Sequence, residues 1–237
     1  RRDVFAGLGL EQLVFRLPEG VSGREGIAET ERLEPGVTSG VNHAYAPPPA
    51  ATAPRGRVYA NGLMGWPEKG CPAAISVGVI DAALPSVTLG LENASLSQAS
   101  FTVAPATSAH GQTVAGLIAG PGRLTDVTLY HAGVVGKAPA GGETAGVDSL
   151  IRALHWMNAN AVPHVNVSLA GPYNKLLDRA VQAAVKRGMI LVAAAGNTGP
   201  NGPPRYPAAF DNTIAVTAID AGLDPYKQAP LGSHIDI

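Results

Sequence analysis

The sequence contains a single cysteine, Cys71, so it can form no disulfide within the chain and no cysteine-rich zinc site. Its longest apolar stretches are short, such as MILVAAA at 189–195, so we expect no transmembrane helix. Charged residues make up only 15% of the chain, and the net charge is −1 without any basic tract. This charge distribution predicts no binding to nucleic acid or to an anionic membrane.

Apolar and turn-forming residues are plentiful instead. Hydrophobic residues make up 46% of the chain, which with so few charges is enough for a sizeable core. The 29 glycines and 20 prolines predict many turns and surface loops. The chain starts at Arg1 without an initiator methionine or a signal peptide, so we expect a processed chain or a fragment.

The first 46 residues have the pattern of a small separate unit. A strand is predicted at 13–17 (LVFRL), a helix at 22–33 with Ser22 as its N-cap, and a second extended segment at 41–46. The segment PPPAATAPRGR at 47–57 has the composition of a linker that does not pack. We therefore expect an N-terminal strand–helix–strand unit at 1–46, a linker at 47–57 and a main domain at 58–237.

The main domain alternates between continuous apolar runs, typical of buried strands, and helical patterns. Strands are predicted at 75–80, 127–135, 164–170, 189–196 and 213–219, and helices at 111–119, 147–159 and 176–188. This alternation predicts an α/β fold of three layers, with a mostly parallel sheet covered by helices on both faces.

Three polar residues stand at positions where such a sheet would bring them together. Asp81 follows one predicted strand, Asn197 follows another, and His110 begins the helix at 111–119. Sites in parallel sheets lie beyond the carboxyl ends of the strands, so we expect the three at one edge. Each also has a simpler reading, as a turn cap (Asp81), an Asx-turn (Asn197) or a structural histidine (His110).

The helix that follows His110 is expected to be buried beneath the imidazole. Val114, Leu117 and Ile118 stand at helical spacing, and the small residues Gly116 and Ala119 are expected to let the helix lie close to the sheet.

Five segments carry a resemblance to a known family. In chain order they are VGVIDAAL, HGQTVAGLIAG, VNVSLAGP, AAAGNTGP and YPAAFDNTIAVTAID. They resemble successive motifs of the subtilisin family of serine proteases, from about Tyr59 to the end of the chain. The resemblance implies a subtilisin-like fold and a serine endopeptidase that hydrolyses peptide bonds with an Asp-His-Ser triad. His110 would be the general base and then the general acid, Asp81 would orient it, and Asn197 would donate to the oxyanion.

The resemblance also implies a peptide or protein substrate and assigns its contacts. The substrate backbone is expected to pair with the segment Ser168, Leu169, Ala170 and Gly171. The primary specificity pocket is expected to be lined by Ala194, Ala195 and Gly196, with a preference for apolar side chains. Residues 1–46 would be an intramolecular propeptide or a plain N-terminal extension, and the protein would be secreted or periplasmic. Calcium is compatible with the family, but we identify no metal ligands.

The sequence departs from the family pattern at the nucleophile. No Gly-Thr-Ser segment occurs up to Ile237, and neither Ser168 nor Ser233 has the right context. We therefore expect the serine beyond the end of this chain, and this chain itself to be inactive. Ala82 and Ala83 also replace the hydroxyl residue and the glycine that usually follow the aspartate.

These departures leave two alternatives open. The first is a non-catalytic subtilisin-fold pseudoprotease that binds peptides or a partner protein. The second is an unrelated α/β protein that binds a nucleotide or phosphate with Asp81 on Mg²⁺, which the lack of a glycine-rich phosphate loop disfavours.

Overall fold

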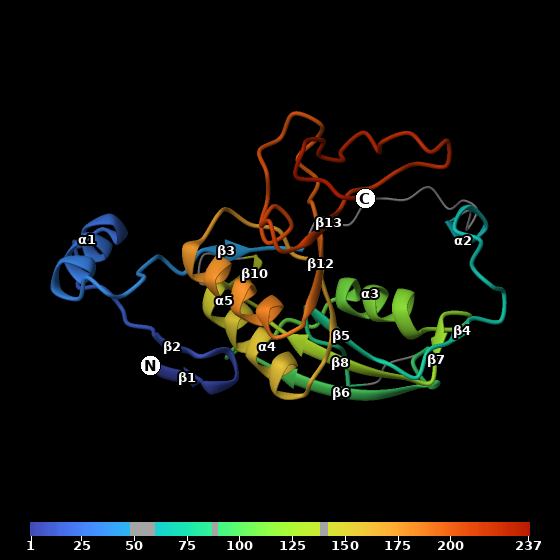
Figure 1. Cartoon of the computed structure of the whole chain (residues 1–237), viewed down its shortest axis with the longest axis horizontal. Helices are drawn as coiled ribbons and strands as arrows, with labels where there is room; N and C mark the ends of the chain where they lie inside the picture. Colours follow the sequence, from blue (N-terminus) through green and yellow to red (C-terminus); the bar gives the residue numbers. More distant parts are fainter. Residues whose placement is uncertain (48–59, 87–89, 138–141) are drawn as a thin grey trace.

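A computed structural model of the protein describes residues 1–47, 60–86, 90–137 and 142–237. Apart from Pro47, the linker predicted at 47–57 lies outside these residues. The described chain is built around a sheet of six strands, all of which run parallel to their neighbours (Figure 1). In spatial order the strands are β13 (Ile214–Val216), β12 (Ile190–Ala194), β11 (His164–Val167), β5 (Ser76–Asp81), β8 (Val127–Gly133) and β6 (Ala94–Ser100).

Helices cover both faces of this sheet. Helix α3 (Ala109–Ala119) packs on β5 and β8 from one side, and α4 (Val147–Ala159) and α5 (Lys175–Lys186) pack together on the other side. The buried apolar residues accordingly form two clusters, a smaller one beneath α3 and a larger one beneath α4 and α5. The predicted three-layer α/β fold is confirmed.

The helices follow from local sequence signals. Helix α4 has the predicted bounds, and its apolar stripe is buried, including Leu150, Leu154 and Met157. Helix α5 begins after Asn174, whose side-chain oxygen accepts from the amides of Leu176 and Leu177 at 2.9 and 3.2 Å.

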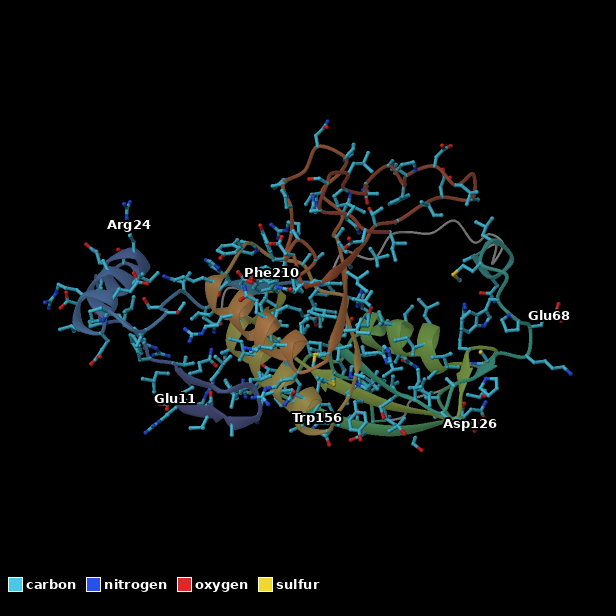
Figure 2. The ribbon with its side chains drawn as sticks, viewed as in Figure 1. Glu11, Arg24, Glu68, Asp126, Trp156 and Phe210 are labelled. Carbon is cyan, nitrogen blue, oxygen red and sulfur yellow. The ribbon has the colours of Figure 1, made fainter. Side chains whose placement is uncertain are left out.

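Aromatic rings fill the outer edge of the larger layer. Trp156 of α4 lies with its ring centroid 5.5 Å from that of Tyr130 on β8 and 5.8 Å from that of Phe101 (Figure 2). Strand β6, which pairs with β8 and ends just before Phe101, is not among the predicted strands. Its sequence ASLSQAS is half polar because it is an edge strand, so it lacks the apolar run typical of the inner strands.

The N-terminal unit consists of β1 (Arg2–Phe5), the 3-10 helix η1 (Ala6–Leu8), β2 (Leu10–Leu13), α1 (Gly23–Leu33) and β3 (Ala44–Tyr45). The helix prediction is confirmed, and Ser22 and Glu25 form a reciprocal capping box. The strand prediction at 13–17 is wrong, because β2 ends at Leu13, where it pairs with Arg2 at the end of the hairpin. Helix α1 lies at the opposite end of the molecule from α2 (Ala60–Leu63) (Figure 1).

Short strands complete the fold. Strand β4 (Cys71–Pro72) pairs with β7 (Leu124–Thr125). Strands β9 (Val135–Lys137) and β10 (Glu143–Gly146) pair with each other, and β3 of the N-terminal unit adds to the free edge of β10. This last pairing fastens the end of the N-terminal unit to the main domain.

Candidate active site

Asp81 is the last residue of β5, and its carboxylate is fully buried at the carboxyl edge of the sheet. The Oδ1 atom accepts hydrogen bonds from the backbone amide of Ala82 at 2.6 Å and from Nδ1 of His110 at 2.9 Å. The donor in the first of these bonds is the backbone N–H of Ala82. Ala82 therefore still contributes one hydrogen bond to Asp81, although it has no side-chain hydroxyl. The carboxylate is thus held by its own turn and aimed at the imidazole.

His110 is the second residue of α3, and its side chain is 25% exposed. Its hydrogen bond to Asp81 raises the pKa of His110 above its ordinary value of 6.5, while partial burial opposes this shift. Because an ionised carboxylate can only accept, the proton lies on Nδ1 in the neutral ring. Nε2 is then free to take a proton from a group in front of it.

Gly111 allows this contact to form. A Cβ atom on Gly111 would lie 2.4 Å from the backbone oxygen of Ala82 and 3.5 Å from Oδ1 of Asp81. The expectation that Gly116 faces the sheet is wrong, because a Cβ atom there would meet nothing within 4 Å. The buried side of α3 consists of Gly111, Ala115 and Ala119, one helical turn apart, and the predicted core residue Leu117 is exposed.

We expect Gly111→Ala to lower the free energy of unfolding by about 1–3 kcal/mol, since its methyl group would push α3 off the end of β5. Gly116→Ala is the matched control in the same helix, and we expect it to stabilise the protein by about 0.5–1 kcal/mol. Urea denaturation of both variants measures the difference. Equal effects of the two substitutions would show that the close approach at Gly111 carries no energetic weight.

The other predicted site residues follow from the register of the parallel strands. Val167 pairs with both Ile80 and Ala193, so Ser168 comes level with Asp81 and Ala194 at the carboxyl edge. Asn197 stands three residues beyond the end of β12 at this edge, and it is partly exposed. Leu169 and Ala195 are buried and face the core, while Gly196 has a φ of +95°, which favours glycine.

The segment expected to bind substrate is paired with the chain's own N-terminal unit. Ala46 and Ala170 form an antiparallel bridge, with N–O distances of 3.3 and 3.0 Å for the two reciprocal hydrogen bonds. On the side away from Ala170, the N-terminal stretch at 44–46 pairs with β10, where Tyr45 stands opposite Ala145. The extended segment at 44–46 therefore lies between β10 and the chain at Ala170, in the extended form that a peptide takes when it pairs with a strand.

Tyr45 anchors that segment. Its side chain is fully buried, and its hydroxyl donates to the carbonyl of Pro172 at 2.6 Å. The ring lies on Gly171, where a Cβ atom would come within 2.3 Å of it. Burial raises the pKa of Tyr45, so the hydroxyl keeps its proton and remains a donor.

Two residues near the site are absent from the sequence prediction. His131 on β8 is buried within the sheet, and burial lowers its pKa from 6.5 to about 4. Arg205 lies beside the predicted specificity pocket, since a Cβ atom on Gly196 would be 3.4 Å from its Cγ atom. The sequence signal that could have indicated His131 is a histidine within a mainly apolar strand. Arg205 lies in a loop, and no pattern in the sequence indicated its position.

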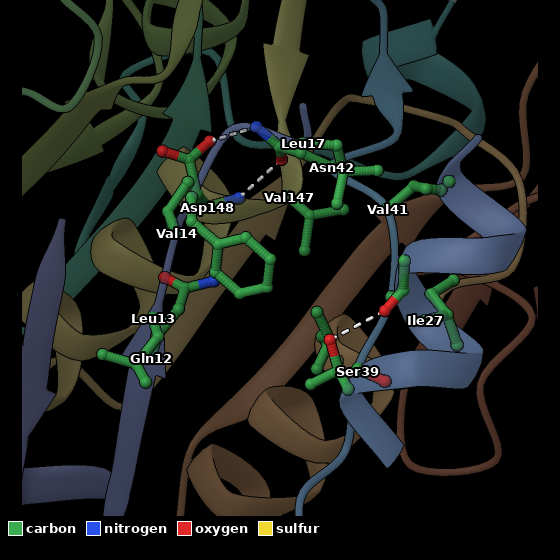
Figure 3. Close-up of a pocket in the computed structure, with 16 residues that line it drawn as sticks. Gln12, Leu13, Val14, Leu17, Ile27, Ser39, Val41, Asn42, Val147 and Asp148 are labelled. Carbon is green, nitrogen blue, oxygen red and sulfur yellow. Dashed lines mark hydrogen bonds between the residues drawn. The ribbon is translucent and has the colours of Figure 1, made fainter. Parts of the chain in front are cut away.

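A cavity between the N-terminal unit and the main domain lies away from Asp81 and His110. Its lining includes Leu13, Ile27, Val147 and Leu176, and at its rim Asn42 and Asp148 exchange two hydrogen bonds of 2.9 and 3.1 Å (Figure 3). Within the described ranges, no three His, Cys, Asp or Glu side chains gather as metal ligands would, and no helix has the length and apolarity to cross a membrane.

We expect Asp81→Asn to lower the pKa of His110, because the hydrogen bond to the carboxylate is the largest cause of its elevation. A raised pKa stabilises the fold fully below pH 6.5 and loses this effect as the pH rises through the raised value. The difference in the free energy of unfolding between wild type and the variant should therefore be largest below pH 6.5. NMR titration of the His110 ring measures the pKa, with D211N at an exposed aspartate as control. An unchanged His110 pKa in D81N would contradict the assignment.

Comparisons with known proteins show which family the chain resembles. The model of the subtilase family matches residues 75–233. Subtilisin DY of Bacillus licheniformis is 29% identical over 180 residues, which is 70% of this chain and 64% of that protein. Subtilisin Savinase of Lederbergia lenta is 34% identical over 136 residues, 54% of this chain and 49% of that protein. The chain thus spans less than two thirds of the length of these curated relatives.

Solved structures share the fold. An S218A mutant of the protease domain of PatA has a TM-score of 0.62 at 24% identity, covering 70% of this chain and 65% of that one. The S393A mutant of the epidermin leader peptide processing protease EpiP from Staphylococcus aureus has a TM-score of 0.63 at 16% identity, covering 81% and 59%. The match to the family model extends over more than half of the sequence, from β5 to beyond β13. The resemblance seen in the sequence is thereby confirmed, and the chain belongs to the subtilase family.

Proposed function

We propose that this chain is the N-terminal and central part of a serine endopeptidase in which Asp81 and His110 serve a serine hydroxyl. The observation that carries the proposal is the 2.9 Å contact between a fully buried carboxylate and a partly exposed imidazole at the carboxyl edge of the sheet. The serine would come from a segment outside residues 1–237. Family membership supports the class of reaction, and the contact supports the roles.

Each residue has one task in this reaction. The serine oxygen attacks the peptide carbonyl while its proton passes to Nε2 of His110, and Asp81 stabilises the imidazolium through Nδ1. The tetrahedral oxyanion accepts a hydrogen bond from the Asn197 amide, a contact whose loss typically costs about 2.7–4 kcal/mol in the transition state. His110 then gives its proton to the leaving amine, and water hydrolyses the acyl-enzyme by the same sequence.

The N-terminal unit acts, in this proposal, as an intramolecular ligand of the expected substrate-binding segment at 168–171. We call the site between this segment and β10 the substrate groove. The reciprocal bridge between Ala46 and Ala170 and the pairing of β3 with β10 support it. The substrate would be a peptide or protein bound in the same extended form. The expected preference for apolar side chains at Ala194, Ala195 and Gly196 stays a prediction, and the aliphatic part of the Arg205 side chain lies beside Gly196. We further propose that the protein acts outside the cytoplasm, as a secreted or periplasmic enzyme.

The alternative is a pseudoprotease that uses this groove only to bind peptides. The occupied groove supports it as well, since pairing at Ala170 needs no nucleophile.

A fluorophosphonate probe separates the two functions. We expect a longer polypeptide, which contains residues 1–237 and continues past Ile237, to be labelled at a serine. The substitution His110→Ala in this polypeptide should abolish labelling. His155→Ala, at a histidine on α4 far along the chain from the site, is the control and should leave labelling intact. A folded, extended chain that takes no label would favour the pseudoprotease, and labelling that survives His110→Ala would refute the role of His110.

A further inference from the structure

His131 shares the α3 face of the sheet with Asp81. In the register of β5 and β8 it stands opposite Val79, two residues before Asp81, and Gly133 stands opposite Asp81 itself. Side chains alternate along a strand, so His131 projects to the same face as Val79 and Asp81. Because Gly133 has no side chain, His131 is the nearest side chain of β8 to the carboxylate on that face.

Two buried polar atoms in this region have no hydrogen-bond partner among the described residues. They are Oδ2 of Asp81 and Nε2 of His131. Asp81 is fully buried and His131 is 1% exposed, so bulk solvent reaches neither atom. Buried polar atoms are almost always satisfied, because a polar atom removed from water without a hydrogen-bond partner destabilises the fold. Two such atoms on one face of two neighbouring strands point to a shared partner.

The chemistry of the two atoms identifies that partner. A carboxylate oxygen of Asp81 accepts hydrogen bonds, and Nε2 of a neutral imidazole accepts one in the tautomer that carries its proton on Nδ1. Burial lowers the pKa of His131, which keeps its ring neutral. In that tautomer the two buried acceptors are satisfied together by one molecule that donates two protons, which is water.

The sequence explains why this arrangement is needed here. Ala82 follows Asp81 and has no hydroxyl, so the turn offers Asp81 only its backbone amide, which bonds Oδ1. We propose that His131 is a positioning residue of the Asp81–His110 pair, holding a water molecule on Nε2 whose second proton is donated to Oδ2 of Asp81. With both oxygens held, the carboxylate cannot rotate away from Nδ1 of His110.

The Nδ1 proton of His110 reports on this arrangement in the chain as it stands. A strong hydrogen bond to a fixed carboxylate gives a low-field proton resonance that exchanges slowly with solvent. We expect His131→Phe to abolish or broaden that resonance, since it keeps the ring's bulk and removes both nitrogens. His131→Gln, which can still accept from a water, should retain it. H155F, the same change at a partly buried histidine that packs against Phe5, should have no effect.

The outcomes decide the proposal. An unaltered His110 resonance in H131F would overturn it, and so would its loss in a folded H131Q variant, which would assign the effect to packing alone. If H131F does not fold, the His110 resonance of H131Q tests the proposal instead. A crystal structure of the full chain is the second test, because a water must lie within hydrogen-bond distance of both Oδ2 of Asp81 and Nε2 of His131. The proposal rests on the proposed pairing of Asp81 with His110. It needs no serine, however, so a failure of fluorophosphonate labelling would leave it standing.

Discussion

Replacing Tyr45 with alanine is expected to release the N-terminal unit from the groove. The ring is fully buried on Gly171, and removing a buried aromatic side chain typically costs about 3–5 kcal/mol. Only two residues of β3 pair with β10, and one bridge joins Ala46 to Ala170. The other hydrogen bonds of this stretch lie before β3, at Val41, Asn42 and His43. We therefore expect the stretch around Ala46 to leave the groove while the six-stranded sheet stays folded.

Hydrogen exchange measures this release at single amides. The amides of Ala46 and Ala170 should lose protection in Y45A, whereas amides of β5 and β11 should keep theirs. Tyr45→Phe is the matched control, since it removes only the hydroxyl that donates to Pro172 and should cost about 0.5–1.5 kcal/mol. Protection at Ala170 that is the same in Y45A as in wild type would mean that Tyr45 does not anchor the segment.

Acidification is expected to destabilise the protein through His131. Burial lowers the pKa of this residue from 6.5 to about 4, so between these values the unfolded state binds a proton that the folded state refuses. Stability therefore falls as the pH drops from about 6.5 to about 4. The full effect is roughly 3 kcal/mol, at 1.36 kcal/mol for each pKa unit.

The comparison with H131Q isolates this contribution from the carboxylates that titrate in the same range. Wild type should lose roughly 3 kcal/mol more than H131Q between pH 6.5 and pH 4 in urea denaturation. H164Q, at an exposed histidine on the neighbouring strand β11, should follow the wild-type curve. Parallel curves for wild type and H131Q would show that the imidazole is not held neutral by burial.

The sequence by itself determined the elements whose signals are local. The sequence predicts helix α4 at its observed bounds because five apolar residues between Val147 and Met157 stand at helical spacing, and it predicts α1 because Ser22 is a favourable N-cap. The inner strands were recognisable as apolar runs, since a strand covered on both faces has no polar side. Strand β6 escaped because an edge strand needs no such run, and the strand expected at 13–17 failed because a hairpin partner set the end of β2.

The order of the motifs also determined the family and the identity of Asp81 and His110 as neighbours. The carboxyl end of β5 and the N-terminus of helix α3, which packs on β5, lie at the same edge of the sheet, so Asp81 and His110 meet at 2.9 Å although they are 29 positions apart.

Only the tertiary structure decided which small residue of α3 faces the sheet, what lies in the groove, and what surrounds Asp81. Gly111 rather than Gly116 meets Ala82, because the rotation of a helix is set by the surface beneath it and not by its own composition. Tyr45 reaches Gly171, and His131 comes beside Asp81, through pairings between distant segments. Such contacts depend on strand order and register, which arise from packing the whole chain and leave no mark in any single stretch of it.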